Sequence, residues 1–239
     1  MTRLLPLAVL LLCARASAGA TPTPDEWQNA GFGRPLLTRV ELESAYREVR
    51  AEPPSGRLTV HAVLPRGPRW TRTRVERHLR AAARVFARCG LMLDAAVLVE
   101  ADAPARPSKF QKEGPGSLKH FIASSPLKER PVLYFFDGWS DLEDDRAFSS
   151  APFTDGPLDD PALWESVFLP AGVDLPAYEE ERRASPYSIA AHELLHVLTR
   201  EGSHFNEEPR HLLNIWRSRS DAVRPDHCER ALRHPSVRR

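Results

Sequence analysis

Two histidines and a glutamate stand close together in the order His192, Glu193, His196. Positions four apart on an α-helix lie nearly above one another, so the two imidazoles would project from one face. Nitrogens held in this way match two corners of a tetrahedral zinc site, with metal–nitrogen distances of about 2.0–2.1 Å. A carboxylate next to the first histidine can act as general base on a water beside the metal. The spacing therefore predicts a metal site with hydrolytic chemistry.

The residues on either side predict the helix that would hold this group. Ser185 is expected to cap the helix, with Pro186 as its first residue, because proline has no N–H to leave unsatisfied there. Apolar residues supply a buried face, and Gly202 is a natural residue at which the helix would stop. The alternative is an ordinary amphipathic helix whose histidines bind nothing, since nine histidines in 239 residues also pair by chance.

A catalytic zinc ion takes three protein ligands and a water, so a third ligand is expected nearby. His204, just past the predicted helix, is the favoured candidate. His211, Glu207 and Glu208 are the alternatives that the residue types leave open. The remaining histidines have no such spacing and are expected in the core or at the surface, the last two of them at the surface: His61, His78, His120, His227 and His234.

The stretch that begins at His192 resembles the metzincin metallopeptidases. Their motif has two histidines with a glutamate after the first, then a glycine, a third histidine and a methionine turn. The resemblance implies that His192, His196 and His204 bind one zinc ion and that Glu193 is the catalytic base.

Two features depart from that motif. Thr199 stands at the glycine position, and His204 comes two positions later than the motif places it. Gly202 is available to reverse the chain and bring His204 to the metal. Leu213 stands at the position of the methionine, which lies beneath the metal without binding it, so a leucine can pack there.

The resemblance implies an α+β fold: a zincin-like or metzincin-like mixed β-sheet, a helix in the N-terminal half and a zinc-binding helix at the active site. It also implies a secreted zinc endopeptidase, a hydrolase that cleaves peptide bonds with a zinc-activated water and Glu193 as general base. Two other functions remain open. One is a non-catalytic secreted zinc protein, closed by a fourth ligand such as His211 or Glu207. The other is a zinc amidase that acts on cell-wall peptides.

Apolar runs predict four strands, and helical spacing predicts a helix between the first two. This order indicates a mixed sheet with helices on one side, and residues 101–130 are expected to be mostly loop. In the proteins that the chain resembles, the substrate lies along the edge strand before the zinc helix, which here would be 164–169. The predicted elements are strands at 58–64, 91–99, 131–136 and 163–169 and a helix at 70–88.

The N-terminus has the features of a secretory signal. Arg3 precedes an apolar run from Leu4 to Leu12, and small residues suited to cleavage follow. Export would place the protein outside the cytoplasm, either extracellular or periplasmic; a lipid anchor at Cys13 is the alternative. The predicted organisation is a signal peptide at 1–20, a linker or pro-segment with a short polar helix at 21–56, and one metallopeptidase domain at 57–239.

Removing the signal leaves two cysteines, Cys89 and Cys228. In an exported protein, two thiols far apart in sequence predict one disulfide. Two buried free thiols, or a reactive Cys89, are the alternatives.

Charge and composition bear on partners. The 33 Lys and Arg residues against 32 Asp and Glu leave a formal charge of +1, which gives no electrostatic basis for binding nucleic acid or, once the signal is removed, a membrane. We expect a monomer whose partner is a protein or peptide substrate. Seven aspartates in 137–160 raise the alternative of a structural calcium ion, but a solvated acidic loop is favoured because the spacing of a calcium loop is absent.

Overall fold

The computed structural model describes most of the chain from residue 22 onwards. The predicted signal at 1–20 lies outside the described residues, as do Asp144 and Asp145 of the acidic segment and the predicted helix cap, Ser185. The described ranges are 22–65, 69–102, 109–112, 116–140, 147–152, 159–174, 188–205, 207–208, 211–214 and 222–239.

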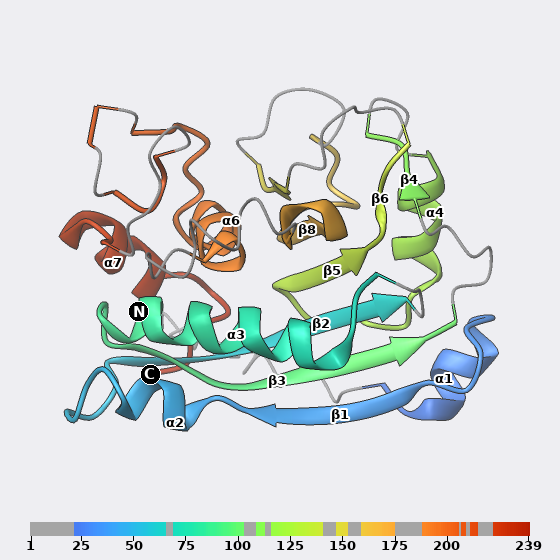
Figure 1. Ribbon diagram of the computed structural model, residues 1–239, viewed down its shortest axis with the longest axis horizontal. Coiled ribbons are helices and arrows are strands. Elements are labelled where there is room, and N and C mark those ends of the chain that lie inside the picture. Colours follow the sequence, from blue (N-terminus) through green and yellow to red (C-terminus); the bar gives the residue numbers. More distant parts are fainter. Residues whose placement is uncertain are drawn as a thin grey trace, which may run out of the picture.

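A six-stranded mixed sheet forms the centre of the molecule (Figure 1). Its four interior strands run parallel, and β1 and β7 pair antiparallel at the two ends. The mixed sheet and all four predicted strands are confirmed. Across the sheet the order is β1 (Leu36–Glu41), β3 (Leu91–Ala101), β2 (Gly56–Pro65), β5 (Val132–Phe136), β8 (Ser166–Pro170) and β7 (Phe148–Ser150). A separate parallel pair joins β4 (Lys109–Phe110) to β6 (Gly138–Trp139).

The edge of the sheet lies one strand further out than predicted. The expected edge at 164–169 falls in β8, which pairs with β5 on one side and with β7 on the other. That prediction is wrong, because β7 is the last strand on this side of the described sheet. A strand of three residues is too short to show an alternating pattern in the sequence.

Helices cover both faces of the sheet, whereas the sequence predicted helices on one side. In β5, Leu133 and Phe135 join the core on one face while Tyr134 and Phe136 join the core on the other. Strands that are apolar on both faces need cover on both. The first face is covered by α3 (Arg72–Ala87), which runs along β2 and β3 in Figure 1, and by α6 (Ile189–Thr199); the second by α1 (Pro24–Asn29) and α4 (Gly116–Ser124).

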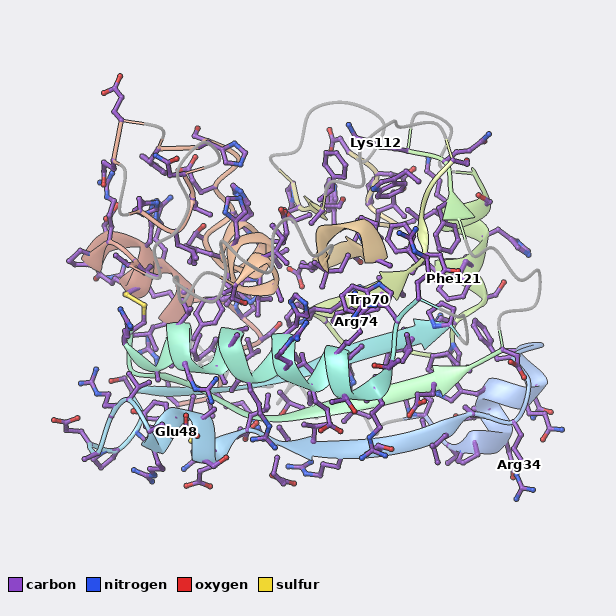
Figure 2. The ribbon with its side chains drawn as sticks, viewed as in Figure 1. Arg34, Glu48, Trp70, Arg74, Lys112 and Phe121 are labelled. Carbon is purple, nitrogen blue, oxygen red and sulfur yellow. A yellow bond between two sulfur atoms is a disulfide. The ribbon has the colours of Figure 1, made fainter. Side chains whose placement is uncertain are left out.

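The predicted helix at 70–88 is α3, and both of its ends are defined by side chains or backbone geometry. The Thr71 hydroxyl accepts a hydrogen bond from the backbone N–H of Arg74, which caps the first turn. Gly90 follows the helix with φ of 72°, a conformation that glycine adopts without strain. The indole N–H of Trp70 donates to the carbonyl of Phe136 over 2.9 Å, which ties the start of the helix to β5. Arg74 lies over the Trp70 ring at 5.1 Å, and both are labelled in Figure 2.

Residues 22–56, the described part of the segment at 21–56 that was expected to be a linker or pro-segment, fold onto the sheet. They form α1, then β1 against β3, then α2 (Glu43–Arg47). Trp27 and Tyr46 are fully buried, so the segment contributes to the core. The short polar helix expected in this segment is present as α2. β1 was not predicted, because its apolar residues do not alternate regularly with polar ones. That the segment is removed during maturation stays a prediction.

The C-terminal region packs beside α6. Its helix, α7 (Pro225–Leu232), is joined to the turn that follows α3 by the disulfide between Cys89 and Cys228, which confirms that predicted pair. A 3₁₀ turn, Ala171–Asp174, follows β8. The expectation of loop at 101–130 is corrected by α4, whose Leu118, Phe121 and Ile122 are buried. None of the helices in the described ranges has the length and apolar character needed to cross a bilayer.

Candidate metal centre

The helix that carries the paired histidines is α6, and it starts later than predicted. Its cap is Ser188, whose hydroxyl accepts from the backbone N–H of Ala191 over 3.2 Å. At the other end the chain reverses at Arg200, which adopts the left-handed conformation with φ of 51°, and not at Gly202. This reversal at the end of α6 turns the following segment back toward the helix.

Three imidazole nitrogens converge beside α6. Nε2 of His192 lies 3.3 Å from Nε2 of His196 and 3.3 Å from Nε2 of His204. Among the described residues, these three histidines are the one group of three or more metal-binding side chains that lie within reach of a common ion. His192 and His196 are buried whereas His204 is exposed, so the group meets solvent on the side of His204.

Backbone carbonyls set which nitrogen of each helical histidine carries the proton. Nδ1 of His192 lies 2.7 Å from the carbonyl oxygen of Leu212, and Nδ1 of His196 contacts the carbonyl oxygen of Glu201. A carbonyl oxygen only accepts, so each Nδ1 must be the donor and carry the hydrogen. In the neutral rings, Nε2 is then left with a lone pair, which is the form that binds a metal.

The distances fit a metal better than they fit hydrogen bonding. The facing Nε2 atoms of His192 and His196 both carry lone pairs, so they repel at 3.3 Å unless a cation lies between them. A tetrahedral zinc ion at about 2.0–2.1 Å from each nitrogen spaces neighbouring ligand nitrogens about 3.3–3.4 Å apart. The two spacings measured from His192 therefore match those of ligands that share one divalent ion.

Burial keeps the three rings in the neutral, metal-binding state. It lowers the pKa of His192 well below the ordinary value, and His196 nearby adds to this. Burial lowers the pKa of His196 to about 4 and also lowers that of His204. All three are therefore unprotonated at neutral pH, and little proton release has to accompany metal binding.

Glu193 lies on α6 between the two helical ligands and faces the edge of the sheet. Its side chain is 7% exposed, and burial raises the pKa of this carboxyl to about 7, although a hydrogen bond from the Ser149 hydroxyl opposes the rise. Ser149 belongs to β7. A carboxyl whose pKa lies near neutrality can both accept and return a proton, as a general base must.

The rival third ligands lie outside the group. Nδ1 of His211 accepts a hydrogen bond from the backbone N–H of Leu213 over 3.0 Å. Glu207 and Glu208 are exposed, and Glu208 pairs with Arg224 at 3.3 Å. Leu213 is fully buried in the core cluster that also contains residues of α6, in agreement with an apolar role at that position.

The remaining histidines divide differently from the prediction. His227 and His234 are 0% and 4% exposed, so their expected surface location is wrong. α7 packs against α6, and the ring of His227 packs against the rings of Phe205 and His211. Residue type does not reveal these contacts, because they depend on how the segments fold together. The other three lie in the core or at the surface. His61 is buried, with Nε2 2.6 Å from a carboxylate oxygen of Glu129. His78 is buried with its ring 5.4 Å from that of Trp70, whereas His120 is exposed.

The acidic segment offers no calcium site within the residues that the structure describes. Asp159 accepts a hydrogen bond from the indole N–H of Trp164 over 3.1 Å. Asp160 pairs with Lys119 at 2.5 Å. Both carboxylates are thus engaged by protein donors.

Three groups at the site had no signal in the sequence. The carbonyls of Glu201 and Leu212 are backbone atoms, so residue type does not mark them. Ser149 stands in a strand of three residues far from α6 in the chain. Contacts of this kind follow from the fold alone.

Comparison with known proteins found no match. No protein-family model matches the chain, and no curated protein matches it in sequence. The function therefore has to be inferred from the residues and their geometry.

Proposed function

We propose that the protein is an exported zinc endopeptidase of metzincin type. The observation that supports this most strongly is the convergence of three imidazoles: Nε2 of His192 lies 3.3 Å from Nε2 of both His196 and His204, and the Nδ1 atoms of the helical pair are held by carbonyls. Three histidine ligands with a free position are typical of catalytic zinc. The disulfide supports the exported location, because such bonds persist in oxidising compartments.

Each residue has a role in the proposed reaction. His192, His196 and His204 would hold the ion, which when bound polarises a scissile carbonyl and lowers the pKa of water towards 7. Glu193 would take the proton from the attacking water and pass it to the leaving amine. Its buried position excludes competing water, and Ser149 orients the carboxyl toward the sheet edge.

The edge strand suggests how a substrate would lie. Since β7 ends the described sheet and carries Ser149 beside Glu193, an extended peptide added along this edge would pass next to the general base. Peptides commonly bind by adding a strand to a sheet edge. A protein or peptide substrate is therefore the class that we favour.

A purely structural zinc site is less well supported. Such a site would be closed by a fourth ligand, and His211 and Glu207 were the candidates. His211 instead accepts from the backbone at Leu213, Glu207 is exposed, and the described residues add no fourth ligand to the three histidines.

The test combines metal analysis with one matched pair of variants. The purified protein should contain one zinc ion per chain and cleave casein, and a chelator should abolish the cleavage. Glu193→Gln should keep the zinc but lower the cleavage rate by about 10²–10⁴-fold, the usual contribution of a general base. Glu207→Gln makes the same change at an exposed position and should leave the rate unchanged.

The outcomes separate the alternatives. Full activity in Glu193→Gln would refute the role of that residue. Zinc without cleavage of casein but with cleavage of peptidoglycan would identify a cell-wall amidase. Zinc with no hydrolysis of either substrate would identify the non-catalytic protein, and absence of zinc would remove the whole proposal.

A further inference from the structure

The C-terminal segment from Ala222 to Leu232 contacts the groups that support the histidine ligands. The first contact begins at Ala222, whose carbonyl accepts from the backbone N–H of Leu212 over 2.8 Å. The carbonyl of the same Leu212 accepts from Nδ1 of His192. Ala222 therefore holds the residue whose carbonyl orients the first ligand.

A second contact starts from α7. Nη1 of Arg230 lies 3.3 Å from Oε2 of Glu201, and Oε1 of Glu201 accepts from the backbone N–H of Ser203. The carbonyl of Glu201 accepts from Nδ1 of His196. Arg230 thus fixes the residue that orients the second ligand, and it also helps to hold the turn leading to the third.

A third contact reaches the neighbour of His204. The ring of Phe205 lies 5.1 Å from the ring of His227, and the guanidinium of Arg224 lies over the Phe205 ring, 5.1 Å from its centre. His227 is fully buried, so its contact with Phe205 is closely packed. Phe205 is directly bonded to the third ligand and limits where His204 can move.

The segment is itself fastened to the core by a covalent bond. Cys228 of α7 is bonded to Cys89, which follows α3, across a sequence separation of 139 residues. The bond is the yellow link between α7 and the end of α3 in Figure 2. Since α3 packs on the sheet, the disulfide fixes the position of α7 relative to that sheet. α6 packs on the same sheet.

From these contacts we propose that 222–232 is a clamp for the metal centre and that Arg230 is a positioning residue for His196. The proposal rests on the proposed zinc site, because a clamp has meaning only if the three histidines bind an ion. Groups that hydrogen-bond metal ligands contribute about 10–100-fold to metal affinity. The clamp therefore predicts that residues far from the ion change how tightly it is bound.

The experiment measures zinc affinity by competition with a chromophoric chelator, together with the melting temperature of the metal-free protein. Arg230→Ala should weaken zinc binding by about tenfold while the metal-free protein melts as wild type. Arg233→Ala is the matched control, since Arg233 directly follows the same helix, is 67% exposed and pairs with Glu229 of that helix. It should bind zinc as wild type does, and Arg230→Lys should restore part of the loss.

Two further variants keep the test decisive. Glu201→Gln removes the carboxylate that Arg230 contacts while leaving the backbone carbonyl in place, and it should match Arg230→Ala. The double variant Cys89→Ala/Cys228→Ala should also weaken zinc binding by about tenfold or more. Wild-type affinity in all of these folded variants would overturn the clamp.

Peptidase activity is a separate readout. A wild-type protein that binds zinc tightly but cleaves nothing would refute the proposed function and leave the clamp to be decided by the affinities. A wild-type protein that binds no zinc would overturn both.

Discussion

Two groups of buried histidines lie near each other in this molecule, and they differ in the backbone group that faces Nδ1 of the ring. In the candidate metal centre, Nδ1 of His192 and Nδ1 of His196 contact carbonyl oxygens. In the second group, Nδ1 of His211 faces a backbone N–H, and its ring packs 5.0 Å from that of His227. The spacing of the rings is similar in both groups. Nδ1 is a hydrogen-bond donor in the first group, whereas Nδ1 of His211 is an acceptor in the second.

The difference shows that backbone polarity decides which histidines can bind a metal. A carbonyl at Nδ1 forces the hydrogen onto that atom and leaves a lone pair on Nε2. An N–H at Nδ1 takes up that lone pair, so the neutral ring of His211 carries its hydrogen on Nε2 and cannot bind an ion there. Both ring nitrogens of His227 are buried without a hydrogen-bond partner in the structure. We therefore regard the second group as packing residues.

The same substitution made in each group gives the largest expected contrast. His196→Asn should lower zinc affinity about a thousandfold, because the roughly 10–16 kcal/mol of a tight zinc site is shared among a few ligands. His211→Asn should change the affinity less than about threefold, since the amide oxygen can replace Nδ1 as acceptor for Leu213. Chelator competition measures both. A large loss in His211→Asn with none in His196→Asn would reverse the assignment of the two groups.

Zinc should also stabilise the fold only where the first group is intact. At free zinc of about 100–1,000 times Kd, binding adds about 3–4 kcal/mol to the free energy of unfolding. We expect this gain in wild type and in His227→Leu, and its loss in His196→Asn. Urea unfolding with zinc and with chelator tests it, and equal gains in all three proteins would contradict a site at His196.

Acid should destabilise the metal-free protein, and the second group should account for part of the effect, since burial also lowers the pKa of His192, His196 and His204. Burial lowers the pKa of His211 to about 4 and also lowers that of His227. Between the ordinary value near 6.5 and the lowered value, the unfolded chain binds protons that the folded chain does not. The free energy of unfolding therefore falls as pH drops below about 6.5, by about 1 kcal/mol per pH unit for each such ring.

His227→Leu sharpens this last prediction. Leucine keeps an apolar contact with Phe205 and removes two buried nitrogens, so stability near pH 8 should stay within about 1 kcal/mol of wild type. The decrease in the free energy of unfolding per pH unit should become smaller by about the contribution of one histidine ring. Urea midpoints at several pH values in chelator measure it. An unchanged slope would mean that His227 is protonated or exposed in the folded chain.

Much of the fold could be predicted because its signals are local. The strands at β2, β3, β5 and β8 are runs of apolar residues, and α3 shows helical spacing between a capping threonine and a glycine. β7 was missed because it has only three residues, and β1 was missed because its six residues show no regular alternation and it pairs with β3, which is distant in sequence. The second helical layer on the sheet, including α4, was missed for the same reason.

The histidine pair on α6 needed no tertiary information. Four-residue spacing on one helix is enough to align His192 with His196, because the helix repeat is set by the backbone. The pairing of Cys89 with Cys228 was also available, since only two cysteines remain once the signal is set aside.

Long-range contacts settled everything else about the centre. The turn at Arg200 and the packing of Phe205 bring His204 to the other two rings, and the carbonyls of Glu201 and Leu212 determine where the protons lie. Every residue has a backbone oxygen, so residue type does not show which of them will contact a histidine. The position of that oxygen depends on how distant segments pack. Residue spacing along one helix is a local property of the chain, whereas the orientation of a ligand is a property of the whole fold.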